Sequence, residues 1–101
     1  MRLPWQPQEK KATNMAISFP NDSRSYDATR RAVHFWGYDR SMESSFFVTA
    51  DALNLIQPNL RFDAADLLRA FDINRERIYA IAAMVYARGR RGSYELGAAD
   101  V

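Results

Sequence analysis

The sequence contains no cysteine, one histidine, and only four glycines and four prolines among its 101 residues. The absence of cysteine excludes a disulfide framework, a thiol nucleophile and any thiolate metal site. A single histidine also excludes a metal site built from several imidazoles. With 48% hydrophobic residues, a chain of this length can fold as one domain around an apolar core without covalent or metal cross-links.

Long hydrophobic runs are missing as well. The most apolar uncharged stretch, residues 78–87, is about half as long as a helix that crosses a bilayer. Residues 1–14 lack the apolar segment of about 7 to 15 residues that a signal peptide requires. We therefore expect no membrane association and a cytoplasmic location.

Charge is unevenly distributed along the chain. Residues 1–14 carry three basic residues and one acidic residue, and this excess of +2 equals the formal net charge of the whole protein. The remaining residues carry eleven arginines and eleven acidic residues, so the charge balance argues only weakly for a polyanionic partner. Because residues 1–14 also lack apolar periodicity, we predict a disordered or loosely docked tail over residues 1–14 and a single domain over residues 15–101.

Alternation of apolar and polar side chains predicts four short strands. They cover residues 16–19, 31–38, 43–49 and 93–96. The second and third strands are separated by only a few residues, which predicts an antiparallel hairpin, and Gly37 is typical of a bulge. The turn-forming residues 21–29 predict a loop.

A short helix over residues 51–56 is predicted after the hairpin. Thr49 or Asp51 can cap its start, and Pro58 ends it. The predicted strands, this short helix and a longer helix after it indicate an α+β domain. Its expected architecture is a small antiparallel or mixed sheet of about four strands, with one short and one long helix packed on one face.

The long helix is predicted to begin after Asp63 and to end at Gly89. Apolar residues recur along it at spacings of three and four, which is the pattern of one buried helix face. Asp72 can instead cap a second helix, which would divide the long helix near residues 71–74. A single helix is the favoured interpretation.

Successive residues of a strand point to opposite sides of a sheet, so the two central strands each have two faces. The face expected to meet the helices is aliphatic and phenylalanine-rich, with Val33, Phe35, Phe46 and Val48. The other face carries amphipathic aromatic and small side chains: Ala32, His34, Trp36, Tyr38, Ser45, Phe47 and Thr49. Because these helices cannot cover both faces, we predict that the second is an interaction surface, unless the segment with Trp5 folds over it or a bulge at Gly37 redirects a ring.

The long helix offers a second surface. Residues 78–87 are uncharged all the way round, and such a helix is normally buried on more than one side. Either the short helix and the loops wrap it, or a second copy of the chain does. A two-fold homodimer is the commonest arrangement of the latter kind.

The sequence provides little that is typical of catalysis. A Ser-His-Asp arrangement around His34 would need a serine nucleophile, and no serine has a nucleophile-elbow context. A strand histidine packed beside Trp36 explains His34 more simply. The carboxylate pairs Asp63/Asp66 and Asp72/Glu76 share helix faces, but capping and solvation explain them. We therefore predict no cofactor and no metal site. A non-enzymatic role is the favoured interpretation, and a small hydrolase or isomerase is a further alternative, because a carboxylate and an arginine can suffice for some chemistry.

Arg75 places a cation in the apolar stripe of the long helix. A buried arginine must be paired, and Asp72, three residues earlier, is the expected partner. A structural ion pair is the favoured interpretation of Arg75, and a ligand site is the alternative.

Three arginines follow the long helix within four residues: Arg88, Arg90 and Arg91. Helix capping and a turn explain this segment, but three guanidinium groups can also grip a phosphate. Together with stacking rings at Trp36 and Tyr38, they provide an alternative function, which is nucleic-acid binding.

Five segments resemble a small bacterial family, the domain-of-unknown-function family 1488. They are MAISFP (15–20), YDATRRAVHFWG (26–37), FFVTADAL (46–53), AFDINRERI (70–78) and YARG (86–89). The resemblance extends from about residue 15 to residue 101. It implies a compact α+β domain of the bacterial cytoplasm, and it implies no established function and no active residues.

The leading hypothesis is a small non-enzymatic binding or regulatory module that self-associates or docks a protein partner, through either the aromatic sheet face or the apolar helix. The alternative is nucleic-acid binding through the three arginines. The candidate interaction residues are His34, Trp36, Tyr38, Phe47, Arg75, Arg88, Arg90 and Arg91.

Overall fold

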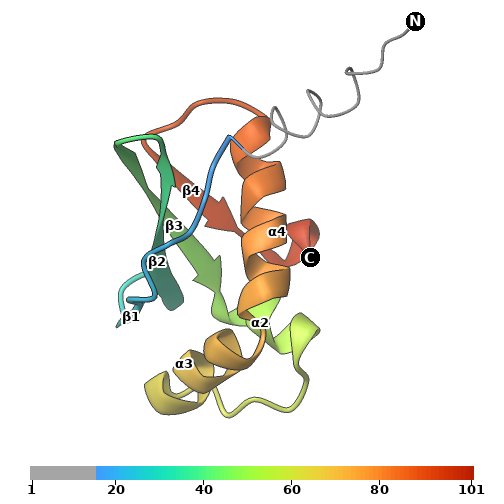
Figure 1. Cartoon of the computed structure of the whole chain (residues 1–101). Helices are drawn as coiled ribbons and strands as arrows, with labels where there is room; N and C mark the ends of the chain where they lie inside the picture. Colours follow the sequence, from blue (N-terminus) through green and yellow to red (C-terminus); the bar gives the residue numbers. More distant parts are fainter. Residues whose placement is uncertain (1–15) are drawn as a thin grey trace, which may run out of the picture.

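The computed structural model describes residues 16–101 (Figure 1). Its strands are β1 (Ser25–Asp27), β2 (Ala32–Asp39), β3 (Met42–Thr49) and β4 (Ser93–Leu96), and its helices are α2 (Ala50–Ile56), α3 (Ala64–Ile73) and α4 (Arg75–Ala87), followed by a 3-10 turn, η1 (Ala98–Asp100). The predicted tail, residues 1–14, lies outside the described residues. None of the helices in the described part is long and apolar enough to cross a membrane.

The four strands form one mixed sheet in the order β1-β2-β3-β4. Strands β1, β2 and β3 pair in antiparallel fashion, whereas β4 runs parallel to β3. The parallel arrangement of β4 follows from its connection, because the chain crosses over through three helices before it returns to the sheet. The predicted α+β class and the four-stranded mixed sheet are therefore confirmed.

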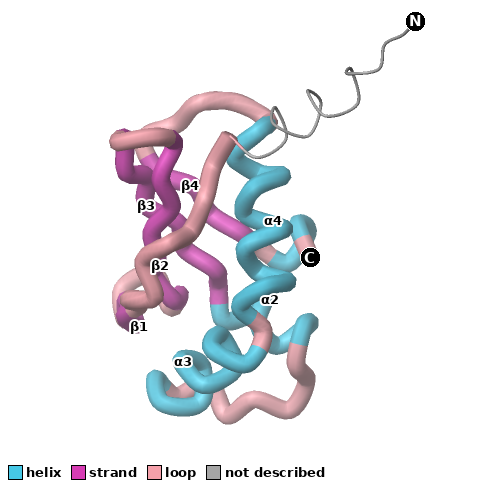
Figure 2. Tube along the Cα trace, viewed as in Figure 1, coloured by secondary structure: helices cyan, strands magenta, loops and turns pink. Residues whose placement is uncertain are grey.

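The helices lie to one side of the sheet, as the cyan and magenta segments of Figure 2 show. The sheet residues predicted to face them are fully buried, and they form one core with residues from each helix. Two such helix residues are Phe71 of α3, whose ring centroid lies 5.1 Å from that of Phe35, and Ile78 of α4. Alternation within β2 and β3 thus identifies the inner face of the sheet correctly.

The predicted bulge at Gly37 is wrong. The pairing of β2 with β3 runs without interruption, and Gly37 stands opposite Ser44. A Cβ atom at Gly37 would lie 2.7 Å from Phe19 Cε2 and 2.9 Å from Phe46 Cε1. The glycine is needed because two aromatic rings lie directly against the backbone of β2.

The predicted strand over residues 16–19 is reduced to a single bridge. Only Ser18 pairs with the sheet, through two backbone hydrogen bonds to Tyr38 of 2.9 and 2.8 Å. Its neighbours Ile17 and Phe19 pack against the core instead, and the Phe19 ring stacks on Tyr79 of α4 at 4.5 Å between centroids. Side-chain packing against α4 therefore holds this segment more than strand pairing does.

The loop predicted over residues 21–29 contains strand β1. Tyr26 stands opposite Val33 of β2 and packs against the core, while Ser25 and Asp27 on either side of it are polar. Strand β1 forms because Tyr26 packs against the core and the edge of β2 offers backbone partners. These two contributions outweigh the turn propensity of the surrounding residues. Asp27 then closes the turn that follows, because its Oδ1 accepts the backbone N–H of Arg30 at 3.0 Å.

The short helix is confirmed as α2. Thr49 is its N-cap, and the Thr49 hydroxyl accepts the backbone N–H of Ala52 at 3.1 Å. Thr49 is the last residue of β3, and α2 begins at the next residue, Ala50. Asp51 therefore lies within the first turn of the helix and cannot be its N-cap.

The long helix is divided at Asn74 into α3 and α4, so the favoured single helix is wrong and the alternative of a division near residues 71–74 is correct. Asp72 is not the cap that this alternative assumed, because it lies within α3 and Asn74 is the N-cap of α4. Asp63 caps α3 as predicted and accepts the backbone N–H of Asp66 at 2.8 Å. The side-chain amide of Asn74 donates to Gln57 Oε1 and to the Ala70 carbonyl, both at 2.8 Å. These bonds compete with regular helix geometry and hold Asn74 at φ −110°, outside the helical region.

Candidate functional site

The outer face of the sheet is the side turned away from the helices (Figure 2). The strand register places side chains on it in four rows. They consist of Tyr38 and Glu43; Trp36, Ser45 and Ser93; Ser25, His34, Phe47 and Glu95; and Asp27, Ala32 and Thr49. No helix among residues 16–101 lies on this side. The residues that alternation assigns to this face are therefore on it, and burial by Trp5 lies outside the described residues.

Four planar groups form a continuous stack on the outer face. The ring centroids of Trp36 and His34 lie 4.3 Å apart, and those of His34 and Phe47 are also 4.3 Å apart. The guanidinium carbon of Arg30 lies 4.0 Å from the Phe47 centroid and completes the stack. Phe47 is consequently only 6% exposed, although it is on the uncovered side of the sheet. Phe47 was predicted as a contact residue, but it is too buried to contact a partner directly. It packs against His34 and Arg30 instead.

His34 is held in the neutral form by this packing. Its Nε2 atom is buried and has no hydrogen-bond partner among the described residues. Loss of solvation is the largest cause that lowers the pKa of His34 below its ordinary value. The imidazole therefore packs between the rings of Trp36 and Phe47 as part of the stack.

Trp36 ends the stack and is half-buried. In its row, Ser45 and Ser93 are too short to cover the indole. The rows on either side end in Glu43 and Glu95, two exposed carboxylates that form no ion pair with any described residue. The open aromatic ring thus lies in the row between those of Glu43 and Glu95. Each glutamate also lines a cleft with arginines: Arg40, Arg90 and Arg91 for Glu43, and Arg30, Arg88 and Arg91 for Glu95.

Tyr38 fixes one of these carboxylates. Its hydroxyl donates to Glu43 Oε2 at 2.6 Å, and this hydrogen bond is the largest cause that raises the pKa of Tyr38. The side-chain amide of Asn21 donates weakly to the same hydroxyl at 3.5 Å. Tyr38 therefore positions Glu43 on the outer face.

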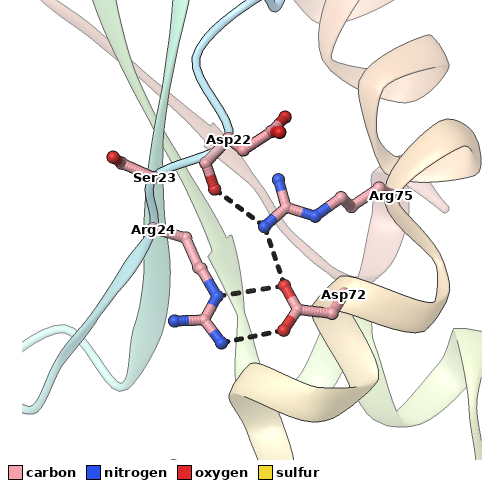
Figure 3. A pocket seen from close by; sticks show the side chains of 5 residues that line it. All are labelled: Asp22, Ser23, Arg24, Asp72 and Arg75. Atoms are coloured by element: carbon pink, nitrogen blue, oxygen red, sulfur yellow. Dashed lines mark hydrogen bonds and ion pairs between the residues drawn. The ribbon is translucent and has the colours of Figure 1, made fainter.

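Arg75 belongs to a separate charged cluster at the junction of α3 and α4 (Figure 3). Its Nη2 donates to Asp72 Oδ1 and to the backbone carbonyl of Asp22, both at 2.8 Å, and its Nη1 donates to the Tyr79 hydroxyl at 2.7 Å. Arg24 donates to both carboxylate oxygens of Asp72 at 3.0 and 2.8 Å, which is the main cause that lowers the Asp72 pKa. The predicted Arg75–Asp72 ion pair is present, and the cluster fastens the segment before β1 to the helices.

The three arginines after α4 differ in their surroundings. Arg88 donates to Asp100 Oδ1 of η1 at 3.1 Å and is neutralised there. Arg90 and Arg91 are exposed and have no carboxylate partner among the described residues. The backbone N–H of Arg91 donates to the Tyr94 hydroxyl at 3.0 Å, which ties this loop to β4.

Helix α4 is buried on one side only. Ile78, Ala82 and Val85 face the core, whereas Met84 is 64% exposed and Ala80 is exposed as well. The short helix and the loops therefore do not wrap α4 completely. Within the described part of the chain, no three His, Asp or Glu side chains gather closely enough to hold a metal ion.

The predicted outer face lacked its charged members, which are Asp27, Arg30, Glu43 and Glu95. A signal for the two glutamates was available, because each falls in a predicted strand at an outward position of the alternation. Arg30 lies between the predicted loop, residues 21–29, and the predicted strand, residues 31–38, and only the folded chain brings it over Phe47.

The comparisons with known proteins agree with this fold. A chain from Shewanella loihica PV-4, described as a protein of unknown function from the DUF1488 family, has a crystal structure that matches with a TM-score of 0.71 and 17% identity. The match covers 80% of this chain and 91% of that one, and it shows a shared fold. No curated protein matches the sequence. The model of the family described as "Protein of unknown function (DUF1488)" matches residues 17–96, and the chain therefore belongs to the DUF1488 family.

Proposed function

We propose that this protein is a non-enzymatic binding module that docks a positively charged segment of a protein partner on Trp36. The observation that carries the proposal is the half-buried indole between the unpaired carboxylates of Glu43 and Glu95. An arginine or lysine of the partner would lie over the ring and meet a carboxylate on either side.

The outer face already contains one contact between a cation and an aromatic ring. Arg30 lies over Phe47 at 4.0 Å, so one end of the stack already holds a guanidinium group on an aromatic ring. Trp36 at the other end offers the ring type that binds cations best, and one such contact contributes about 0.5 to 2 kcal/mol, depending on its desolvation. Tryptophan is also among the residues that most often dominate the energy of protein interfaces.

The charges around Trp36 favour a cationic protein segment over nucleic acid. A phosphodiester stacked on this ring would approach two carboxylates, which repel it, and Arg30 is engaged with Phe47 and Asp27. The rings at Trp36 and Tyr38 therefore lend the nucleic-acid alternative little support.

The proposal is tested with a synthetic basic peptide. In a Trp5→Phe background, Trp36 is the only tryptophan, so its fluorescence reports binding of acetyl-Gly-Arg-Gly-Arg-Gly-amide. We expect saturable binding of this peptide, and no binding of the matched peptide that carries glutamate in place of arginine. In the same background, Trp36→Leu and Trp36→Phe are followed by NMR; Leu should weaken binding about fivefold or more, and Phe should weaken it less.

The two carboxylates are tested by Glu43→Gln and Glu95→Gln, each of which should weaken binding. Glu76→Gln is the matched control, because Glu76 is also exposed and free of ion pairs with described residues but lies on α4. The proposal is wrong if the arginine peptide does not bind at millimolar concentration, or if the Glu76 variant weakens binding as much as the Glu43 and Glu95 variants.

A further inference from the structure

Arginines without an ionic partner converge at one end of the molecule. Eleven arginines lie among the described residues, and six of them pair with carboxylates. Of the other five in this part of the chain, three line one cleft: Arg40, Arg90 and Arg91. The cleft therefore concentrates cationic charge that the described residues do not neutralise through ion pairs.

The cleft lies between the β2–β3 turn and the loop that follows α4. Figure 1 shows both segments at the same end of the fold, although they are about fifty residues apart in the sequence. Arg40 comes from the turn, Arg90 and Arg91 come from the loop, and the rings of Tyr86 and Tyr94 contribute to the wall. Its volume of about 540 Å³ is within the range of sites for small ligands.

Two carboxylates also line the cleft, and each is engaged by a tyrosine. Asp39 Oδ2 accepts the Tyr86 hydroxyl at 2.7 Å, and Glu43 accepts the Tyr38 hydroxyl at 2.6 Å. Neither forms an ion pair with a described arginine. Both carboxylates keep their negative charge, so the cleft carries three cationic and two anionic groups and is positive on balance. The three guanidinium groups form no ion pair with a described residue.

The backbone conformation at Arg40 sets where its side chain lies, and Arg31, Asn59 and Phe62 also have positive φ. Arg40 has φ +63°, a left-handed conformation that suits glycine or asparagine in a two-residue hairpin turn. A non-glycine residue there is uncommon, and it places a long cationic side chain at the tip of the hairpin, beside the loop with Arg90 and Arg91.

We propose that this cleft binds the phosphate group of a small phosphorylated molecule. Guanidinium groups are the side chains best matched to phosphate oxygens, since each can donate two parallel hydrogen bonds. Arg40, Arg90 and Arg91 approach from both walls, and Ser41 and Ser44 add hydroxyl groups to the lining. The cleft takes an anion and the outer-face site takes a cation, and Glu43 lies at both, so each proposal is tested with its own ligand and can fail without the other.

The test measures binding of inorganic phosphate and of adenosine monophosphate to the full chain by NMR, at low ionic strength in a buffer without phosphate. We expect shifts in the side-chain Nε–H signals of Arg40, Arg90 and Arg91 with both probes, and none with adenosine. Arg40→Gln and Arg90→Gln should each weaken binding about tenfold. Arg77→Gln is the matched control, because Arg77 is also exposed and unpaired among the described residues but lies on α4.

Retained binding in the Arg40 and Arg90 variants, or equal weakening by Arg77→Gln, would overturn the site. A short single-stranded oligonucleotide separates two kinds of phosphate source. If it binds and neither inorganic phosphate nor adenosine monophosphate does, the small-molecule proposal is wrong and the cleft recognises a polymer. Because these arginines are exposed, thermal unfolding of each variant should match that of the wild type, so that a loss of binding reports on the cleft.

Discussion

Substitution of Gly37 by alanine tests the packing on which the inner face of the sheet depends. The new methyl group would lie 2.7 Å from Phe19 Cε2, 2.9 Å from Phe46 Cε1 and 3.1 Å from Ile17 Cγ1. Distances below 3.0 Å between carbon atoms require a neighbour to move. Phe46 is fully buried in the core and has no free space, so Phe19, which is only half-buried, must shift.

The expected cost follows from two opposing effects. Insertion of a methyl group into a packed core costs about 1 to 3 kcal/mol, whereas replacement of glycine by alanine restricts the unfolded chain and returns about 0.4 to 1 kcal/mol. Three close contacts at Gly37 place the cost near the upper end, so Gly37→Ala should lower the free energy of unfolding by about 2 kcal/mol.

Urea unfolding followed by circular dichroism measures this loss as a lower midpoint with an unchanged slope. Gly92→Ala is the matched control, because a Cβ atom at Gly92 meets nothing within 4 Å. The double variant Gly37→Ala/Phe19→Leu should cost less than the sum of its two single variants, since a smaller side chain at position 19 relieves the clash. If Gly37→Ala is no less stable than Gly92→Ala, the close approach of the rings does not constrain this position.

Three further outcomes are expected. Phe71→Ala should lower the free energy of unfolding by about 3 to 5 kcal/mol in urea titrations, because Phe71 is fully buried between sheet and helices. Asp72→Asn should lower it by about 0.5 to 2 kcal/mol, less at high salt, since water screens a carboxylate that is 38% exposed even though two arginines bind it. Burial lowers the pKa of His34 below 6.5, so the unfolded chain binds its proton more readily; stability should fall as the pH drops below 6.5, and His34→Gln should reduce that fall.

The inner face of the sheet could be predicted from the sequence because its signal is local. In β2 and β3, aliphatic and phenylalanine residues alternate with a period of two, and this pattern alone specifies which side chains pack against the helices. The α2 cap could be predicted for the same reason, since Thr49 and the helix it caps are neighbours in the sequence.

Features that depend on distant partners could not be predicted. The division near Asn74 could be predicted only as an alternative to a single helix, because it depends in part on a hydrogen bond to Gln57, seventeen residues away. Strand β1 forms because the edge of β2 is free and Tyr26 reaches the core, whereas its neighbours locally favour turns. Gly37 resembles a bulge until the rings of Phe19 and Phe46 are placed against it.

The same distinction applies to the candidate sites. Alternation assigned Trp36 and His34 to the outer face, but no local pattern shows that Arg30 folds over Phe47 and buries it. The arginines after α4 looked like one cluster in the sequence. In the fold, Arg88 forms an ion pair with Asp100 and does not line the cleft. Arg90 and Arg91 line it together with Arg40, which comes from a turn about fifty residues earlier in the sequence.

Glu43 connects the two proposed sites. It lies in the row beside Trp36 on the outer face and also lines the arginine cleft, and Tyr38 holds it in place. A phosphate in the cleft would add negative charge on the side of Trp36 where Glu43 stands, and this charge attracts a cation on the indole. The coupling is therefore expected to be positive, and by thermodynamic linkage the basic peptide must strengthen phosphate binding by the same factor. Because the interaction crosses a surface exposed to water, salt at about 1 M, where the screening length is about 3 Å, should abolish the coupling.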